Sequence, residues 1–481
     1  MADTNQVQLS YVEETTFGST PASALTDLRI TGETLSLDIT SIQSNEIRND
    51  RMIDDLIQQS AEPGGGFDFE FSYESPPDTF FEAALCTTWG QSAAGTAVDY
   101  SSGLNNISFA AADNSINDAN SGFVTAGIRA GQWLRVSGNA TAANNTLHKV
   151  LSVVAAKIVC TNDTTIVTDD GTLDTVVIKG TVNIATIALD AGDANGVYTD
   201  DAIDMEDEGI RVGQWVEIRG FTTPANNGYK LVTAVSGVTF TTLQTTVLEV
   251  QGDSVTVKGN MIRNDNVNHF YSIQRELVDA VQFFNHRGMT VNTLAITVTA
   301  DEIVTGSLDF MGATVATTDL AQTTHGTGAN TAAPTNDAFT AISNVASIME
   351  GATLAAIAAD LYVQELSFSL NNNLRGKKAI GTFGNAATGM GTCDVTGSMN
   401  VLFNDETLYD KYLAGTETAL TFKCEDSSGN AYIFTFHAVK FETDDGGKAT
   451  GLDADVVENI AWKAIRDVTY DCVIQIDKFP A

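Results

Sequence analysis

Cysteine is scarce in this chain. Its 481 residues hold five cysteines, an odd number, and none forms a Cys-x-x-Cys pair. This excludes a disulfide framework and is typical of a reduced, intracellular protein. The five are Cys86, Cys160, Cys393, Cys424 and Cys472.

Positive charge is scarce as well. The chain has 25 Lys and Arg against 61 Asp and Glu, a formal net charge of −36. That balance excludes a protein that gains affinity for nucleic acid by neutralising phosphates. An acidic surface still suits a protein that faces DNA without holding it, and it equally keeps an abundant protein soluble.

Long apolar runs are also missing. No run approaches the length of a membrane span, and the start Met1-Ala2-Asp3-Thr4-Asn5 lacks a basic segment followed by an apolar one. We therefore expect no membrane partner, and synthesis and assembly in the cytoplasm.

Patterns for catalysis, cofactors and metals are not found. Gly64-Gly65-Gly66 precedes a strand and no Lys-Ser/Thr follows it, so a phosphate-binding loop is excluded. The stretch around Asp193 lacks two ligands of a calcium loop, and Asp54-Asp55 and Asp444-Asp445 read as solvated loop charges. The histidines, His148, His269, His286, His325 and His437, are too far apart to indicate a zinc site. We expect no enzyme, no cofactor and no metal.

The chain does contain an internal duplication. A strand, a long loop, a second strand and a helix recur in the same order near both ends. Arg48 corresponds to Arg375 with a shift of 375 − 48 = 327, and Thr79 to Thr407 with 407 − 79 = 328. Copies that share an order of elements tend to share a fold, and a duplicated fold can build a pseudo-symmetric assembly.

A second repeat interrupts the first. Residues 127–136 reappear as residues 209–218, so that Trp133 matches Trp215 with a shift of 215 − 133 = 82. Short alternating runs between Gly, Asn and Asp turn signals predict two small β modules. The two tryptophans could be sugar-stacking platforms, but their Gly-Gln-Trp-apolar setting favours core positions.

These patterns predict a mainly β fold. We expect duplicated β-sandwich or barrel domains with flanking helices, plus two tandem small inserted β domains. Ser75 as N-cap with Pro76 and Asp78 predicts the start of one helix, and Asn404-Asp405-Glu406 that of the other. The expected boundaries are 1–95 for the first part of copy 1, 96–180 and 181–262 for the inserted modules, 263–350 for the completion of copy 1 and a connecting loop, and 351–481 for copy 2.

Two long loops and the amino-terminal segment are candidate contact elements. Loops this long are usually functional or interaction arms, although an ordinary solvated excursion stays open. The opposite charge bias of the two loops suits contact between different subunits. The first loop, residues 41–66, carries Arg48, Asp50, Arg51, Asp54 and Asp55, and the second, residues 371–391, carries Arg375, Lys377 and Lys378. The amino-terminal segment, with Gln8, Tyr11, Glu13 and Phe17, reads as an extended arm that stays mobile until it docks.

Long, ordered blocks of the sequence resemble the major tail tube proteins of long, non-contractile-tailed bacteriophages, the siphophages. The blocks are residues 9–18, 29–33, 45–51, 67–73 with the helix to Leu85, 287–294, 302–312, 371–381 and 408–412. The resemblance covers about residues 1–95 and 263–481. It stops at the insertion, whose role it does not supply.

The resemblance implies tail-tube β-sandwich domains packed into rings, whose inner sheets join into a continuous barrel and stack into a DNA conduit. The long loops and the amino-terminal arm would reach the next ring. The tape measure protein and the tail terminator and tip proteins would be partners, and the chain would reside in the virion tail after assembly in the host cytoplasm.

The duplication adds an expectation about symmetry. Three chains would give six similar domains around the axis, although a hexamer stays open. We expect a lumen lined mainly by acidic and neutral residues, so that genomic DNA slides without tight binding. Two other classes stay open, a glycan-binding receptor-binding or adhesion protein and a cell-wall hydrolase, and the second would need catalytic residues that the sequence does not show.

Overall fold

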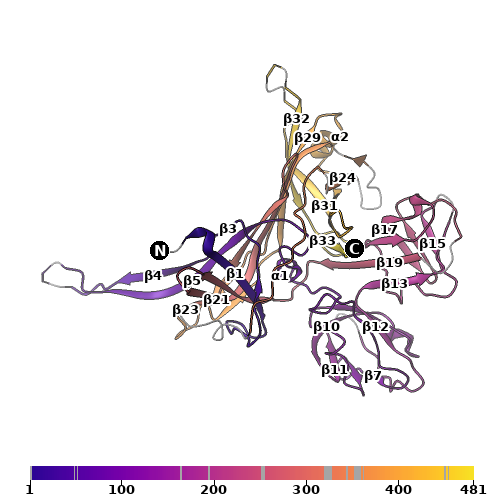
Figure 1. Ribbon diagram of the computed structural model, residues 1–481, viewed down its shortest axis with the longest axis horizontal. Helices are drawn as coiled ribbons and strands as arrows, with labels where there is room; N and C mark the ends of the chain where they lie inside the picture. The colour runs from indigo at the N-terminus through magenta and orange to yellow at the C-terminus, as the bar shows by residue number, and fades with distance from the viewer. Residues whose placement is uncertain are drawn as a thin grey trace.

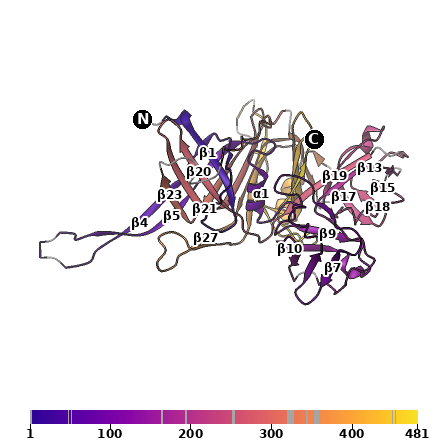
Figure 2. The same ribbon diagram turned by 60° about the horizontal axis from the view of Figure 1, so that its bottom comes forward.

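The computed structural model describes residues 3–47, 49–50, 52–162, 165–192, 195–250, 255–318, 328–342, 345–351, 359–360, 362–448, 451–452 and 454–481. Within these ranges the fold is mainly β, as predicted, with the α-helices α1 (Asp78–Leu85) and α2 (Thr407–Ala414). No helix in this part of the chain has the length and apolar character needed to cross a membrane. Figures 1 and 2 show a body of long strands, with a hairpin projecting from one side and two small modules on the other.

The first copy is a set of antiparallel strands. β1 (Val7–Glu14) pairs with β20 (Phe270–Leu277), which pairs with the first half of β21 (Gln282–Thr299). β23 (Thr314–Thr318) lies on the other side of that half. The second half of β21 pairs with β22 (Thr305–Met311), and β5 (Leu56–Glu70) and β4 (Ser36–Gln43) follow. β21 therefore runs from one sheet layer into another, as strands at the corners of β-sandwiches do.

The second copy repeats every one of these pairings. β24 (Val345–Gly351), β30 (Thr418–Glu425) and β31 (Ala431–Asp444) take the places of β1, β20 and β21. β33 (Gln475–Phe479), β32 (Val457–Ala464), β29 (Asp394–Leu402) and β26 (Val363–Asn371) take those of β23, β22, β5 and β4. Even the β-bulges recur, between Tyr271 and Ile273 and between Thr418 and Leu420. The duplication thus extends to the irregularities of the ladders.

One hydrophobic core runs through both copies. Phe71 of the first copy packs on Tyr432 and Phe434 of the second, with ring centroids 5.6 and 6.0 Å apart. Helix α1 buries Phe80 and Phe81 in this core. Because large aromatic side chains from both copies share one core, the copies form a single folded body.

Each inserted module is a β fold with its own core. The first comprises β6 (Asp99–Ser101), β7 (Ile107–Ala110), β8 (Ser115–Asp118), β9 (Trp133–Ser137), β10 (Leu147–Val154), β11 (Lys157–Cys160) and β12 (Val177–Lys179). The second comprises β13 (Val182–Ile187), β14 (Asp190–Ala191), β15 (Val197–Thr199), β16 (Trp215–Arg219), β17 (Gly228–Ser236), β18 (Thr239–Thr242) and the start of β19 (Val255–Arg263). β19 then continues into the body, where it pairs with β33. Asp193 lies outside the described residues.

Short elements complete the chain. They are the strands β2 (Thr26–Asp27), β3 (Gly32–Glu33), β25 (Ala359–Asp360), β27 (Arg375–Lys377) and β28 (Ala387–Gly389), and the 3-10 turns η1 (Thr4–Gln6), η2 (Ala142–Asn144) and η3 (Pro224–Asn226). β3 continues the edge of β4 along β5, and β27 pairs with β28.

Two local predictions are wrong. Residues 41–66 are not one loop, because β4 and β5 extend into a long hairpin that leaves only residues 44–55 as the connection. Both faces of this hairpin are exposed, so its sequence has no alternation of buried and exposed residues by which it could be found. Ser75 is not the N-cap of α1 either: Pro77 is, and Ser75 instead exchanges backbone hydrogen bonds with Ser72.

Candidate assembly surfaces

The two copies meet edge to edge in one continuous sheet. The second half of β21 pairs with β26 over seven residues, from Thr293 opposite Asn371 to Thr299 opposite Glu365. The joined sheet runs β4, β5, β22, β21, β26, β29, β32, β31. Each copy therefore contributes four strands, and the β21–β26 ladder is the junction between them.

Hydrogen bonds extend this junction beyond the ladder. The amide of Asn372 donates to the Asn292 carbonyl (2.8 Å), and the Asn292 side chain accepts from the Leu374 amide (2.9 Å). The Asn372 side chain is buried and donates to the carbonyls of Ala84 (2.9 Å) and Val291 (3.1 Å). Asn372 thus ties the start of the second long loop to both α1 and β21.

The two faces of the joined sheet differ. One face is apolar and buried, with Leu294, Ile296, Phe368 and Leu370 at the junction. Side chains at the alternate positions point away from the core. They include Ser36 and Asp38 (β4), Glu62, Asp68 and Glu70 (β5), Thr305, Ser307 and Asp309 (β22), Thr293, Ala295, Thr297 and Thr299 (β21), Glu365, Ser367, Ser369 and Asn371 (β26), Asp394, Thr396, Ser398 and Asn400 (β29), Asn459, Ala461 and Lys463 (β32), and Lys440 and Thr443 (β31). The side chains just named are small or polar, with seven carboxylates against two lysines.

Both ends of the joined sheet are open. In the described part of the chain, β4 pairs with β5 alone, and the last residues of β31, 440–444, pair with β32 alone. These strands are the counterparts of β26 and β21, which pair with each other inside the chain. The molecule therefore displays, at its two ends, the two halves of the junction that it contains in its middle.

The projecting hairpin, formed by β4, β5 and residues 44–55, is apolar at many exposed positions. Its exposed apolar side chains are Ile39, Ile42, Ile47, Met52, Ile53, Leu56 and Ile57. At its tip the Asp50 carboxylate accepts a hydrogen bond from the Met52 amide (3.2 Å), and the Asp55 carboxylate accepts one from the Leu56 amide (2.8 Å). Asp54 lies between these two acids in the sequence. Arg48 and Arg51 lie outside the described residues. An exposed apolar strand pair of this length is a surface that another chain can cover.

The second long loop folds back onto the first copy. Lys378 donates to the Ala61 carbonyl (3.0 Å) and pairs with Glu62 (3.2 Å), while the Asn385 side chain donates to the Gly312 carbonyl (2.7 Å). Arg375 and Lys377 are exposed, and Arg375 donates to the Met390 carbonyl (3.2 Å). The two loops were expected to meet between subunits, and here the second one contacts the base of the projecting hairpin within one chain.

The amino-terminal segment lies in the sheet of its own chain. β1 pairs with β20 over its full length. Tyr11 packs on Phe80 with centroids 4.8 Å apart, Phe17 packs on Phe270 at 5.0 Å, and Glu13 accepts from His269 (2.8 Å). The Gln8 side chain donates to the Leu9 carbonyl (2.7 Å). All four arm residues are thus engaged within the chain, and a role in reaching the next ring stays a prediction.

The first inserted module docks through a buried ion pair. Arg129 donates to both oxygens of Glu82 on α1 (2.6 and 3.1 Å), and Gln132 donates to the carbonyl of Trp89 (3.0 Å). Burial raises the pKa of Glu82, and the Arg129 guanidinium opposes that shift. Such bidentate pairs fix orientation as well as position.

The second module docks through Trp215. This side chain is buried with Ile433 and Phe479 of the second copy, and its ring nitrogen donates to Thr435 (3.2 Å). Its counterpart Trp133 is half-buried and donates to Asp265 (3.3 Å). Trp215 is therefore a core residue, whereas Trp133 borders the junction between modules and body.

A pair of carboxylates lies beside the open edge of β31. Glu458 is 1% exposed, and one oxygen each of Glu458 and Asp444 has no hydrogen-bond partner in the described ranges. Burial, followed by hydrogen bonding and charge from Asp444, raises the pKa of Glu458 to about 8. The ladder register puts Leu294 and Gly306 at the corresponding places in the first copy. The sequence named Asp444 but gave no signal for Glu458, because only the fold brings the two together.

Comparison with known proteins gives one match. The family model described as phage tail tube protein matches residues 4–464, which span the first copy, the insertion and the second copy as far as the end of β32. No curated protein matches the chain.

Proposed function

Since this chain belongs to the phage tail tube protein family, and is thus a structural protein of the virion tail that self-assembles into a tube, we propose that three copies close each ring. Stacked rings then conduct DNA into the host, as in the long, non-contractile tails of siphophages. The tape measure, tail terminator and tip proteins are its expected partners in such a tail, which would be assembled in the host cytoplasm.

One observation supports the proposal: the two open ends of the joined sheet are the equivalents of the two strands that pair at the junction inside the chain. Open strand edges are a liability unless they are paired. Joining the end of β31 of one chain to β4 of the next places Thr443 and Asp444 where Thr293 and Leu294 lie in the β21–β26 ladder, and it closes both ends of the joined sheet. With eight strands from each chain, three chains close a barrel of 24 strands with pseudo-sixfold symmetry.

The duplication also gives the register of this contact. Ladder positions in β31 follow those in β21 with a shift of 439 − 289 = 150, and positions in β26 follow those in β4 with 369 − 36 = 333. Thr293 faces Asn371 inside the chain. Thr443 of one chain should therefore face Asp38 of the next.

A cysteine pair tests this register. Directly opposite Cβ atoms lie about 5 Å apart, within reach of a disulfide after small adjustment, whereas diagonal neighbours lie roughly 7–8 Å apart. The double variant Asp38→Cys/Thr443→Cys should form covalent closed trimers on oxidation of assembled tubes. The control Ser36→Cys/Thr443→Cys, displaced by two residues on the same face, should link far less. Equal linking in both variants, or closed hexamers, would contradict the proposal.

The polar face of the joined sheet is the proposed lumen. Its carboxylates outnumber its lysines, and Lys463 is paired with Asp394 (2.7 Å). Like charge keeps a passing polyanion from binding, so DNA would slide along this face. A reconstruction of the tube with a predominantly basic bore would contradict this assignment.

The inserted modules are proposed to decorate the exterior. They lie on the side of the body away from the projecting hairpin (Figures 1 and 2). The chain enters and leaves them at neighbouring points, since the amides of Asp265 and Val267 donate to the carbonyls of Leu85 (2.8 Å) and Cys86 (2.7 Å). Replacing residues 93–257 with a short Gly-Ser linker should leave tubes of unchanged bore. Loss of assembly would show that the modules are part of the wall.

A further inference from the structure

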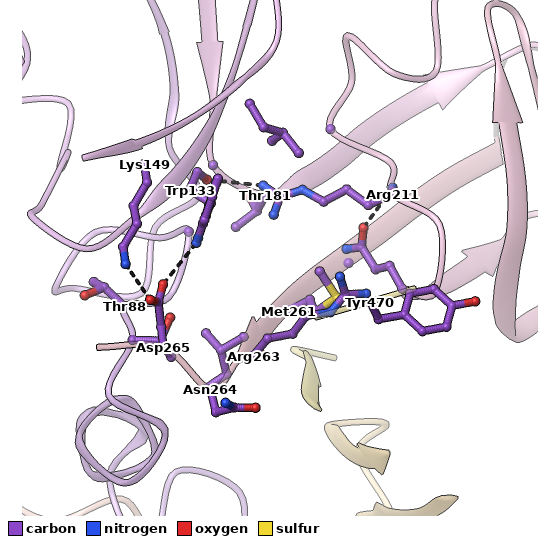
Figure 3. A pocket seen from close by; sticks show the side chains of 18 of the residues that line it. Thr88, Trp133, Lys149, Thr181, Arg211, Met261, Arg263, Asn264, Asp265 and Tyr470 are labelled. Atoms are coloured by element: carbon purple, nitrogen blue, oxygen red, sulfur yellow. Dashed lines mark hydrogen bonds and ion pairs between the residues drawn. The ribbon is translucent and has the colours of Figure 1, made fainter. Parts of the chain in front are cut away.

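A cavity of about 540 Å3 lies where the two inserted modules meet the body. Its wall is formed by residues from the first module, the second module and the segment that returns to the body. Figure 3 shows Trp133 and Lys149 from the first module, Arg211 from the second, and Arg263, Asp265 and Tyr470 from the body around one space. A cavity of this size admits a small organic molecule.

The two modules provide an internal comparison for this cavity. Arg129 and Arg211 are equivalent, with a shift of 211 − 129 = 82, and the amide of each donates to the glutamine three residues later (2.8 and 3.3 Å). The Arg129 guanidinium is held by both oxygens of Glu82. The Arg211 guanidinium reaches across to the Trp133 carbonyl (3.3 Å), and no described carboxylate pairs with it. Among the described residues, Arg211 thus has no counterpart of the Glu82 carboxylate that holds Arg129.

The other charges around the cavity do not compensate Arg211. Asp265 is paired with Lys149 (2.5 Å), and Asp471 with Arg466. Arg263 lies over the Tyr470 ring at 5.3 Å and donates to Gln475 (2.8 Å), again without a carboxylate partner among the described residues. Burial, together with the charges of Arg263 and Arg135, lowers the pKa of Arg211 to about 9. Two cations without an acid partner therefore share one wall in a chain of net charge −36.

We propose that this cavity binds a small organic carboxylate, whose carboxylate pairs with Arg211 as Glu82 pairs with Arg129. A bidentate carboxylate is the natural partner of a guanidinium fork. The remaining wall includes Trp133, Leu147 and Met261, which suit an apolar or aromatic body attached to the acid group. This combination favours an organic acid over a bare inorganic anion.

Calorimetric titration of the purified full-length chain tests the proposal. Benzoate is the probe, benzamide its uncharged analogue, and acetate, citrate and inorganic phosphate the competitors. A charge-assisted hydrogen bond contributes enough that benzoate should bind about tenfold or more tightly than benzamide. Arg211→Gln should weaken benzoate binding by about the same factor, and Arg211→Lys by less because it keeps the charge but loses the fork.

A matched variant controls for charge alone. Arg219→Gln removes a cation from the same module, where half-exposed Arg219 pairs with buried Glu217 away from the cavity, and it should leave benzoate binding unchanged. If the Arg211→Gln chain does not fold, benzoate binding in the cavity is measured in the native chain through the quenching of Trp133 fluorescence. The Trp133→Phe chain, otherwise native, assigns the signal to Trp133. Four results would overturn the proposal. Benzamide could bind as tightly as benzoate, or phosphate could bind more tightly than benzoate. A folded Arg211→Gln chain could bind benzoate as the native chain does, or none of the three carboxylates could bind.

Discussion

The two copies of the duplicated body share every strand pairing and differ in what their long hairpins contact. In the second copy, residues 371–391 turn back and bond to the first copy through Lys378 and Asn385. In the first copy, the hairpin projects from the body with Ile47, Met52 and Leu56 exposed. One element thus finds its partner within the chain, while its equivalent presents the same kind of surface outward. We propose that the partner of the first hairpin is another chain.

The edges of the joined sheet show the same contrast. At the internal junction Leu294 is fully buried, whereas the equivalent place at the open edge holds Asp444 beside Glu458. Apolar side chains suit a contact that forms once during folding, and titratable ones suit a contact made later between folded chains.

The largest effect is expected from removing the tip of the projecting hairpin. Replacing residues 44–55 with an Asn-Gly turn keeps the Gln43–Leu56 pair but deletes the exposed apolar tip. The chain should fold with unchanged melting temperature, yet form no long tubes by negative-stain microscopy. The matched change in the second copy, residues 378–386 to Asn-Gly, should lower the melting temperature because that loop docks within the chain. Normal tubes from the first variant would remove the assigned role of the projecting hairpin.

A smaller effect is expected at Asn372, which anchors the second hairpin. Asn372→Ala leaves the carbonyls of Ala84 and Val291 without their donor in a buried place, which costs about 1–3 kcal/mol of unfolding free energy. Denaturant titration of unassembled chain measures this. Asn404→Ala, whose exposed side chain contacts Asp405, should change the unfolding free energy by less than about 0.5 kcal/mol. Similar losses in both variants would contradict the anchoring role.

Glu458 should make stability depend on pH in a limited window. Its pKa in the fold is raised to about 8, above the ordinary value near 4.3. The folded state therefore binds the proton of Glu458 more tightly than the unfolded chain does. Protonated Glu458 stabilises the fold at low pH, and this stabilisation is lost as pH rises toward and through 8. Glu458→Gln should flatten the decline in melting temperature between about pH 5 and pH 8.5. An equal decline in both chains would show that this carboxylate does not titrate as described.

The smallest effect is expected from Lys378→Ala. The Lys378–Glu62 pair is partly exposed, and such pairs contribute roughly 0–1 kcal/mol. The melting temperature should fall slightly, and added salt should reduce the difference from the native chain. A loss as large as that of Asn372→Ala would mean that Lys378, rather than Asn372, holds the second hairpin.

Much of the fold could be predicted because the repeats are visible in the residues themselves. The match of Trp133 with Trp215, and of Thr79 with Thr407, located the modules and the helices. Aromatic and polar residues alternate from Phe67 to Glu70, at the end of β5, which is typical of a half-buried strand because burial on one face imposes a period of two. The hairpin arms of β4 and β5 lacked that period, since neither face is covered in the chain.

The surfaces that carry the proposals could be predicted only in part. Asp50, Asp54 and Lys378 were found because they lie in long loops of opposite charge. The β21–β26 junction, the facing of the polar side chains and the meeting of Glu458 with Asp444 depend on strand register, which local sequence does not fix. The lack of a described carboxylate partner for Arg211 stands out only by comparison with Arg129, which Glu82 holds from a distant place in the sequence.

The most direct test of the account is a cryo-electron-microscopy reconstruction of the tube that resolves individual strands. We expect three chains in each ring, with the end of β31 of one chain paired to β4 of the next and Thr443 opposite Asp38. Six chains in a single layer, or a β31 edge that stays unpaired in the assembled tube, would contradict it.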